Sequence, residues 1–148
     1  MDPLSITASI IALVQAVGAV AKGVRALRSI KNAPTELCAL CNEVATLQAA
    51  MEQGQLTSEF MVKNKSLFPG AASKQIRSAL ISIENTVSEI EKFVLRVSPK
   101  DQASNPTAKN RKSTWYRERR NMATLREKAR LAREQLTLCL SSLHSSEM

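Results

Sequence analysis

PLSITASIIALVQAVGAVAKGVRALRSIK, residues 3–31, is the stretch that decides the fold. Its larger apolar residues lie alternately four and three positions apart, at Ile6, Ile10, Leu13, Val17, Val20, Val24 and Leu27. This spacing places them on one face of an α-helix, whereas a strand would alternate every second residue. A helix with one apolar stripe has to bury that stripe against another element. The stretch therefore predicts a helix at residues 4–31 that packs against partners.

The same alternation recurs in three later stretches of the chain. It predicts helices at residues 34–53, 71–97 and 113–144. Four apolar seams of similar length predict an all-α fold, a four-helix bundle with mostly antiparallel helices. A chain of 148 residues is long enough to bury one such core without disulfides or metal, so a single domain over residues 1–148 is expected.

Two segments between these helices lack a clear apolar pattern. Gly54 is interpreted as the end of the second helix, and residues 55–70 as an irregular segment, either a loop or a short helix on the bundle. Residues 98–112 carry no apolar residue except two alanines, which predicts a polar linker.

The composition excludes several classes of protein. Aromatic residues make up 3% of the chain, and four glycines and five prolines are too few for the turns of an all-β fold. The sequence has no glycine-rich phosphate-binding turn. Its single histidine, His144, lies near the C-terminal end and provides no catalytic Ser/His/Asp or Cys/His set. We therefore expect no enzyme activity, no catalytic residue and no cofactor.

The three cysteines are better interpreted as packed thiols than as a metal site. Cys38 and Cys41 form a C-x-x-C pair, and Cys139 and His144 are the only further candidates for a four-ligand zinc site. A thioredoxin-type site would need a strand before the helix, and the pattern predicts none. No metal site is expected, and three free thiols are typical of a reducing compartment.

The first helix is also a candidate for contact with a membrane. Residues 3–21 are 19 consecutive uncharged residues, close to the length of a membrane-spanning helix. The residues predicted to insert are Leu4, Ile6, Ile10, Ile11, Leu13, Val14, Val17 and Val20. A basic collar follows, predicted to contact lipid headgroups, at Lys22, Arg25, Arg28 and Lys31. A stripe of small residues, suited to close packing of helices, comprises Ala8, Ala12, Ala16, Ala19 and Gly23.

Other interpretations of this segment are a buried core helix, a helix lying at a membrane surface, or a signal peptide. Ala19, Val20 and Ala21 resemble a signal-peptidase site, but no basic residue precedes the apolar run, as a signal peptide requires. We therefore expect a cytoplasmic chain with conditional association to the plasma membrane.

The net charge of +8 favours anionic partners. Residues 109–133 concentrate basic side chains and begin near Trp115 and Tyr116, so nucleic-acid binding is a possible interpretation. Glutamates interrupt the stretch and no basic-zipper pattern is present, which favours a solvated face or a face for anionic lipid or a partner. Trp115 is predicted to be a packing anchor at one end of the bundle, the alternative being contact with lipid or a partner.

The opening of the chain resembles the fungal N-terminal domain of STAND proteins, the HeLo-like group. The resemblance is most specific over the first fifty residues, in MDPLSITASIIALVQ at residues 1–15, PTEL at 34–37 and NEVATL at 42–47, together with Gly18, Val24 and Leu27. It continues at Trp115, Leu125, Leu136, Leu138 and Leu140.

The resemblance implies a helical bundle of the kind found at the N-termini of fungal immune-receptor-like proteins. Some members of that group execute cell death in heterokaryon incompatibility, where the N-terminal helix leaves the bundle and oligomers disrupt the plasma membrane. It also implies a homo-oligomer, and a STAND/NLR-type or other helical protein as a partner. No nucleotide-binding or repeat sequence follows Met148, so both a free-standing domain and a fragment are considered.

The sequence thus supports one leading hypothesis and two alternatives. The leading hypothesis is a non-enzymatic immune or cell-death effector domain that meets anionic membranes through its first helix. The alternatives are a structural module for self-association or partner docking, and a basic nucleic-acid-binding protein.

Overall fold

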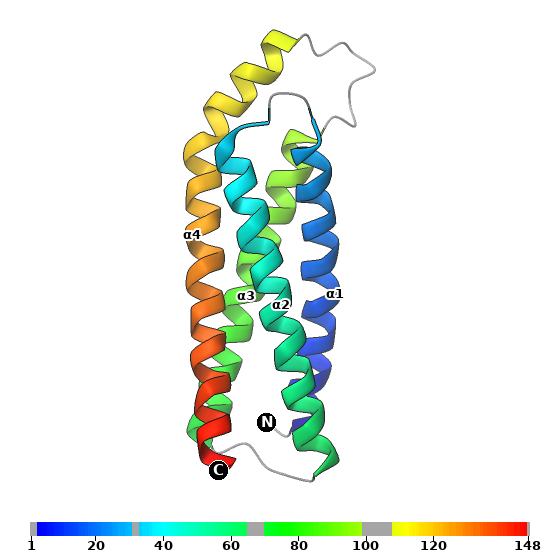
Figure 1. Cartoon of the computed structure of the whole chain (residues 1–148), viewed down its shortest axis with the longest axis vertical. Coiled ribbons are helices and arrows are strands. Elements are labelled where there is room, and N and C mark those ends of the chain that lie inside the picture. Colours follow the sequence, from blue (N-terminus) through cyan, green and yellow to red (C-terminus); the bar gives the residue numbers. More distant parts are fainter. Residues whose placement is uncertain (1–2, 31–32, 65–69, 99–107, 148) are drawn as a thin grey trace.

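The computed structural model describes the backbone of residues 3–30, 33–64, 70–98 and 108–147. In this part of the chain four helices account for nearly all residues: α1 (Pro3–Arg28), α2 (Thr35–Lys63), α3 (Gly70–Val97) and α4 (Ala108–Glu147). They form one elongated bundle, and the start of α4 extends beyond the end of the other three helices (Figure 1). The prediction of an all-α four-helix bundle is confirmed.

The helices follow one another around the bundle in the order α1, α2, α4, α3. In the described residues α1 packs on α2 and α3, and α4 packs on the same two helices, whereas the pairs α1–α4 and α2–α3 lie on the diagonals. The chain runs up, down, up and down (Figure 1), so α1–α2 and α3–α4 are antiparallel, while α1–α3 and α2–α4 run parallel. The predicted antiparallel packing therefore holds for two of the four neighbouring pairs.

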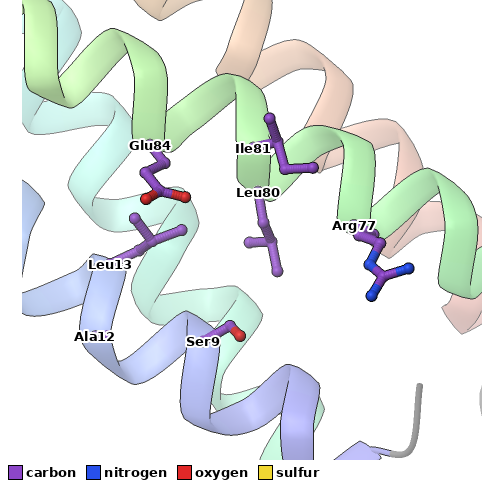
Figure 2. Close-up of a pocket in the computed structure, with 7 residues that line it drawn as sticks. All are labelled: Ser9, Ala12, Leu13, Arg77, Leu80, Ile81 and Glu84. Carbon is purple, nitrogen blue, oxygen red and sulfur yellow. The ribbon is translucent and has the colours of Figure 1, made fainter.

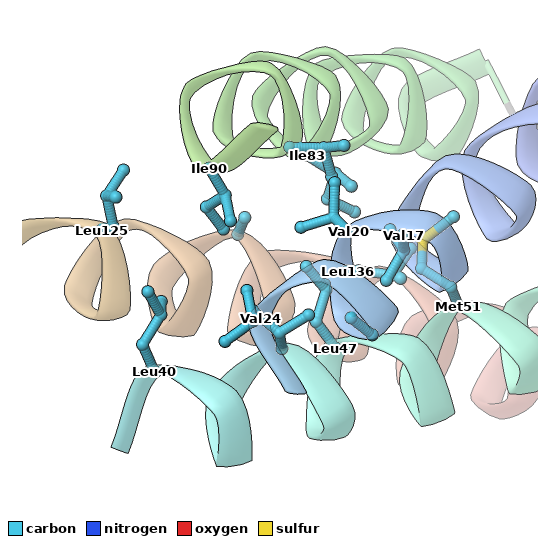
Figure 3. Packing of buried hydrophobic residues seen from close by; sticks show 14 of the residues in the cluster. Val17, Val20, Val24, Leu40, Leu47, Met51, Ile83, Ile90, Leu125 and Leu136 are labelled. Atoms are coloured by element: carbon cyan, nitrogen blue, oxygen red, sulfur yellow. The ribbon is translucent and has the colours of Figure 1, made fainter. Parts of the chain in front are cut away.

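The core is built from the apolar seams that the spacing indicates. Val17, Val20 and Val24 of α1 point inward beside Leu47 of α2 and Ile83 of α3 (Figure 3). Burying such side chains stabilises the fold by about 25 cal/mol for each Å² of apolar surface removed from water. The most completely buried side chains include Phe93, Ile6, Leu37, Leu40, Leu47, Met51, Ile76, Ile83, Ile90, Met122, Leu136 and Val17.

The predicted end of α2 at Gly54 is wrong, because the helix continues to Lys63. Beyond Met51 its buried face goes on at Gly54, Ser58 and Met61, three or four residues apart. Gly54 is buried at the contact with α4, where a Cβ built on it would lie 3.6 Å from Cδ1 of Leu140. Residues 55–64 are thus helix and its C-cap rather than an irregular segment, and residues 65–69 lie outside the described part.

The predicted start of α4 at residue 113 is also wrong, because the helix begins at Ala108. Residues 108–112 have the sequence AKNRK, in which alanine, lysine and arginine favour helix although none of them supplies an apolar seam. The polar linker predicted at 98–112 is therefore helical in its last five residues, and residues 99–107 lie outside the described part. At the same end of the bundle α1 ends at Arg28, before the predicted residue 31.

We predict that Gly54→Ala stabilises the protein by about 0.5–1 kcal/mol, because alanine loses less backbone entropy on entering a helix. The new methyl group would make an ordinary contact with Leu140. Urea denaturation followed by circular dichroism measures the change.

Gly23→Ala is the matched comparison. Its Cβ would lie 3.0 Å from Cγ1 of Val94, a β-branched side chain with little freedom to turn away, so this variant should be less stable than the wild type. A lower free energy of unfolding for Gly54→Ala would contradict the packing of α2 on α4.

Candidate functional site

The most distinctive feature of the bundle is the way α1 is attached to it. The apolar face of α1 packs on α2 and α3, with Ile6, Val17 and Val24 fully buried. One buried hydrogen bond, between the hydroxyl groups of Thr7 and Ser58, joins α1 to α2. In the described part of the chain no ion pair joins α1 to another helix. Its attachment therefore depends chiefly on apolar burial.

The other three helices are joined by ion pairs as well as by apolar contacts. Arg119 and Arg133 of α4 donate to Glu36 and Glu43 of α2, at 2.6 and 2.8 Å. On the opposite side of α4, Glu118 accepts two hydrogen bonds from the Arg96 guanidinium of α3, at 2.9 and 2.8 Å. Lys128 of α4 likewise reaches Glu89 of α3 at 2.9 Å. Each partly exposed pair contributes at most about 1 kcal/mol, but together they fix α4 in register with both neighbours.

The structure places the eight predicted membrane-inserting residues mainly on the packed face of α1. Ile6, Ile10, Val17 and Val20 are buried, and three others, Ile11, Leu13 and Val14, are half-buried. Leu4 is 67% exposed. The helix from Leu4 to Arg28 is long and apolar enough to cross a membrane, a criterion that a buried core helix also satisfies. In the folded bundle this surface is therefore held against α2 and α3.

The outer face of α1 is small and uncharged along most of its length. Ala8, Ala12 and Ala19 of the predicted small-residue stripe are exposed, and Gln15 lies between them. The stripe thus faces outward and not onto another helix of the same chain, except at its end. There Gly23 lies against Val94 of α3. In the middle of the stripe Ala16 is half-buried. A surface helix usually carries charges on this face.

The basic collar stands at the C-terminal end of α1. Lys22, Arg25 and Arg28 are exposed, and none of them forms an ion pair within the described residues. Their charges are favourable at the negative end of the helix dipole. Lys31, the fourth predicted collar residue, lies outside the described part.

The basic stretch of α4 is partly neutralised by carboxylates, which pair with four of its seven basic side chains that the structure describes. Arg130 pairs with Glu127 and Glu134 of the same helix, in addition to the pairs with α2 and α3. Arg117, Arg120 and Arg126 are exposed and form no ion pair within the described residues. This arrangement leaves a discontinuous basic surface.

Trp115 is buried near the start of α4, with 6% of its surface exposed. Its indole Nε1 is buried too, and no hydrogen-bond acceptor for it lies within the described residues. The side chain therefore contributes apolar packing at this end of the bundle.

The cysteines form no common site. Cys38 and Cys41 lie in α2, Cys139 lies in α4, and all three are free thiols. Burial raises the pKa of the Cys139 thiol, which disfavours the reactive thiolate. In the described part of the chain no group of three or more His, Cys, Asp or Glu side chains could hold a metal ion.

Sequence reasoning missed two surface features near the end where α1 begins. One is a groove between α1 and α3, with a volume of about 300 Å³, lined in part by Ala12, Leu80 and Ile81 (Figure 2). The other is an exposed pair on α2, Leu56 and Phe60, which was assigned to the irregular segment. The only sequence signal was that Ile81, Leu56 and Phe60 lie outside the apolar seams.

No family model, curated protein or solved structure matches this chain. Its function is therefore argued from its own residues and their arrangement.

We predict that acid selectively weakens the ion pairs of α4. The hydrogen bonds from Arg96 hold the pKa of Glu118 below its usual value of 4.5. A carboxylate with a lowered pKa in the folded state stabilises the fold above its unfolded pKa, and this contribution disappears as the pH falls through the folded pKa. The wild type should lose stability below about pH 4.5, and Glu118→Gln should lose less over the same range.

At pH 7 we expect Glu118→Gln to be less stable than the wild type by up to about 1 kcal/mol. Denaturation curves at a series of pH values measure both effects. Glu52→Gln, at an exposed carboxylate without an ion pair in the described residues, is the control and should follow the wild type. Equal pH dependence in all three proteins would contradict the role of Glu118.

Proposed function

We propose that this chain is a non-enzymatic domain that targets anionic membranes through α1, which leaves its seat on α2 and α3 after oligomerisation. The observation that carries the proposal is the attachment of α1. It is an apolar helix whose described collar residues, Lys22, Arg25 and Arg28, form no ion pair, and within the described residues no ion pair joins it to the three helices that ion pairs hold together. It can therefore separate without breaking the ion pairs of the described core.

A membrane can replace what α1 loses on leaving the bundle. The energy that holds α1 is mainly the burial of side chains such as Ile10 and Val17, and a hydrocarbon phase buries them equally well. Lipid would also cover Leu4, which water contacts in the bundle. The change is a shift between two populations, driven by the difference in burial between the two states.

The outer face of α1 supports this proposal over a simple core helix. A charged residue at the centre of a membrane helix costs about 2.5–3.5 kcal/mol. Ala8, Ala12 and Ala19 impose no such cost, although a helix that only served a soluble bundle could carry Lys or Glu at these exposed positions. The collar would then lie at the headgroups, where each cation contributes about 1 kcal/mol on an anionic surface.

The surface that α1 leaves behind would then stabilise the oligomer. Its departure exposes apolar side chains of α2 and α3, among them Leu47, Met51 and Ile83. Exposed surface of this kind favours association with further copies of the chain. A homo-oligomer with inserted helices is the arrangement that buries both surfaces.

The resemblance of the first fifty residues to the HeLo-like group gives this proposal a biological setting. In that setting the chain is a cytoplasmic fungal protein of innate immunity or programmed cell death, with conditional association to the plasma membrane and a STAND/NLR-type partner. The alternative of a self-association or docking module is favoured by the groove and by the exposed pair on α2. Nucleic-acid binding is less well supported, because glutamates pair with four basic residues of α4.

We predict that the protein binds and permeabilises vesicles that contain phosphatidylserine, at low salt, and that Ala8→Asp reduces both effects more than tenfold. Ala8 is exposed, so the bundle tolerates the change, but a carboxylate within the hydrocarbon costs up to about 2.5–3.5 kcal/mol. Cosedimentation and dye release measure binding and leakage. Ala49→Asp, at an exposed alanine of α2, carries the same charge and should behave as the wild type.

A reversible lock tests whether α1 has to move. The side chains of Thr7 and Ser58 meet between α1 and α2, so a Thr7→Cys, Ser58→Cys double variant can form a disulfide there. We expect leakage to disappear when this disulfide is formed and to return on reduction. Leakage by the oxidised variant, or a wild type that ignores anionic vesicles at low salt, would refute the proposal.

A further inference from the structure

The groove between α1 and α3 combines an apolar floor with two opposite charges. Leu80 and Ile81 of α3 and Leu13 of α1 line it, and Arg77 and Glu84 stand at either end (Figure 2). Ile81 is 52% exposed, which is unusual for a residue beside a helix seam. Neither Arg77 nor Glu84 forms an ion pair within the described residues.

These charges indicate the class of occupant. A lipid or another anionic amphiphile would be attracted by Arg77 but repelled by Glu84. An amphipathic helix that presents apolar side chains between a carboxylate and an ammonium group would satisfy both ends and the floor. The groove is thus suited to a protein helix of mixed charge.

This chain carries such a helix face on α2. Leu56 and Phe60, one turn apart, are 61% and 56% exposed. Glu52 precedes Leu56 by four residues and Lys63 follows Phe60 by three, so opposite charges stand at the two ends of the apolar pair. The exposed carboxylate of Glu59 lies on the same face and accepts a hydrogen bond from Gln55. Glu52 and Lys63 are both exposed, and neither forms an ion pair within the described residues. We call Glu52, Leu56, Phe60 and Lys63 together the α2 ridge.

We propose that the α2 ridge of one copy docks into the α1–α3 groove of a second copy. Leu56 and Phe60 then cover Leu80 and Ile81, Glu52 approaches Arg77, and Lys63 approaches Glu84. The charges match only when the incoming α2 runs in the same direction as α3, because the reverse direction places like charges together. The charge pattern therefore selects one orientation of the partner.

The contact is heterologous, because the ridge and the groove are different surfaces of the chain. Each copy keeps a free groove or a free ridge after pairing, so association can continue beyond a dimer. The apolar area of two side chains is small, so the contact belongs to the weak class of interfaces. Ala12 and Leu13 of α1 form one wall of the groove, and docking consequently requires that α1 is packed on α2 and α3.

Complementation between two variants tests the proposal in lipid-free solution. Phe60→Glu disables the ridge and Ile81→Glu disables the groove, and both positions are exposed, so the folds should be retained. By sedimentation velocity over a dilution series, we expect the wild type to form species larger than a dimer and each variant alone to stay monomeric. An equal mixture of the two should form 1:1 dimers and nothing larger, because one variant supplies the ridge and the other the groove.

Leu131→Glu, at a 53% exposed leucine of α4, is the matched control and should associate as the wild type does. Circular dichroism and thermal melting establish that every variant is folded. A monomeric wild type, a mixture that stays monomeric, or a single variant that associates as the wild type does would overturn the proposal. A charge test is independent of the apolar substitutions: Glu84→Lys should weaken association, and Lys63→Glu in the same chain should restore it.

This inference does not depend on membrane binding. Phe60 and Ile81 lie outside α1, so their variants should bind vesicles at least as well as the wild type does. Absence of vesicle binding with intact complementation would refute the membrane proposal alone, and the reverse result would refute the docking proposal alone.

Discussion

Burial of the apolar face of α1 against α2 and α3 is the contact on which the rest of the structure depends. It covers the inner sides of both helices, including Met51 and Ile83, and no other described helix covers the core on that side. Apolar burial is non-directional, and its strength depends on the phase that competes for the same surface. The pairs Arg133–Glu43 and Arg96–Glu118 are directional and need matched partners. One bundle thus holds its helices by two kinds of interaction, which respond to different conditions.

The outer face of α1 is a compromise between water and a less polar phase. Alanine at positions 8, 12 and 19 exposes little apolar surface, so the bundle can remain in solution without charges there. The same residues remove the desolvation cost that Lys or Glu would impose in lipid or in a helix contact. A charged outer face would keep α1 in contact with water, because its charges are costly to desolvate. Leu or Ile at these positions would favour aggregation. The small uncharged residues leave both environments accessible.

The apolar spacing predicted the four helices and the inward side of each. The period of the apolar residues indicates a helix, and their positions within that period indicate its buried face. Gly54 was misread as a stop, since only the structure shows that Leu140 packs over it. The start of α4 was placed too late, because AKNRK forms helix without any apolar seam. The order α1, α2, α4, α3 was not predictable, as four seams of similar character fit several arrangements.

Only part of the candidate site could be predicted from the sequence, because the rest depends on contacts between distant residues. The uncharged length of α1 and its collar are local properties of the sequence. The pairing of Arg119 with Glu36, 83 residues away, is not a local property, and pairs of this kind neutralise part of the basic stretch of α4. The groove likewise arises only when Ala12 and Ile81 are brought together by the parallel packing of α1 on α3. Contacts between distant residues therefore help to choose between the interpretations that composition alone leaves open, such as a nucleic-acid-binding face or a solvated face on α4.

The two proposals meet at α1, which is both a wall of the groove and the candidate membrane helix. A ligand that binds only one state of a protein stabilises that state by RT ln(1 + L/Kd), where L is the free ligand concentration. Under the two proposals, a second copy would bind the groove only while α1 is packed on the bundle, and lipid would bind only when α1 is released. Self-association through the groove and insertion into a membrane would therefore oppose each other. Chains on a membrane would contact one another through the surfaces of α2 and α3 that α1 uncovers, and not through the groove.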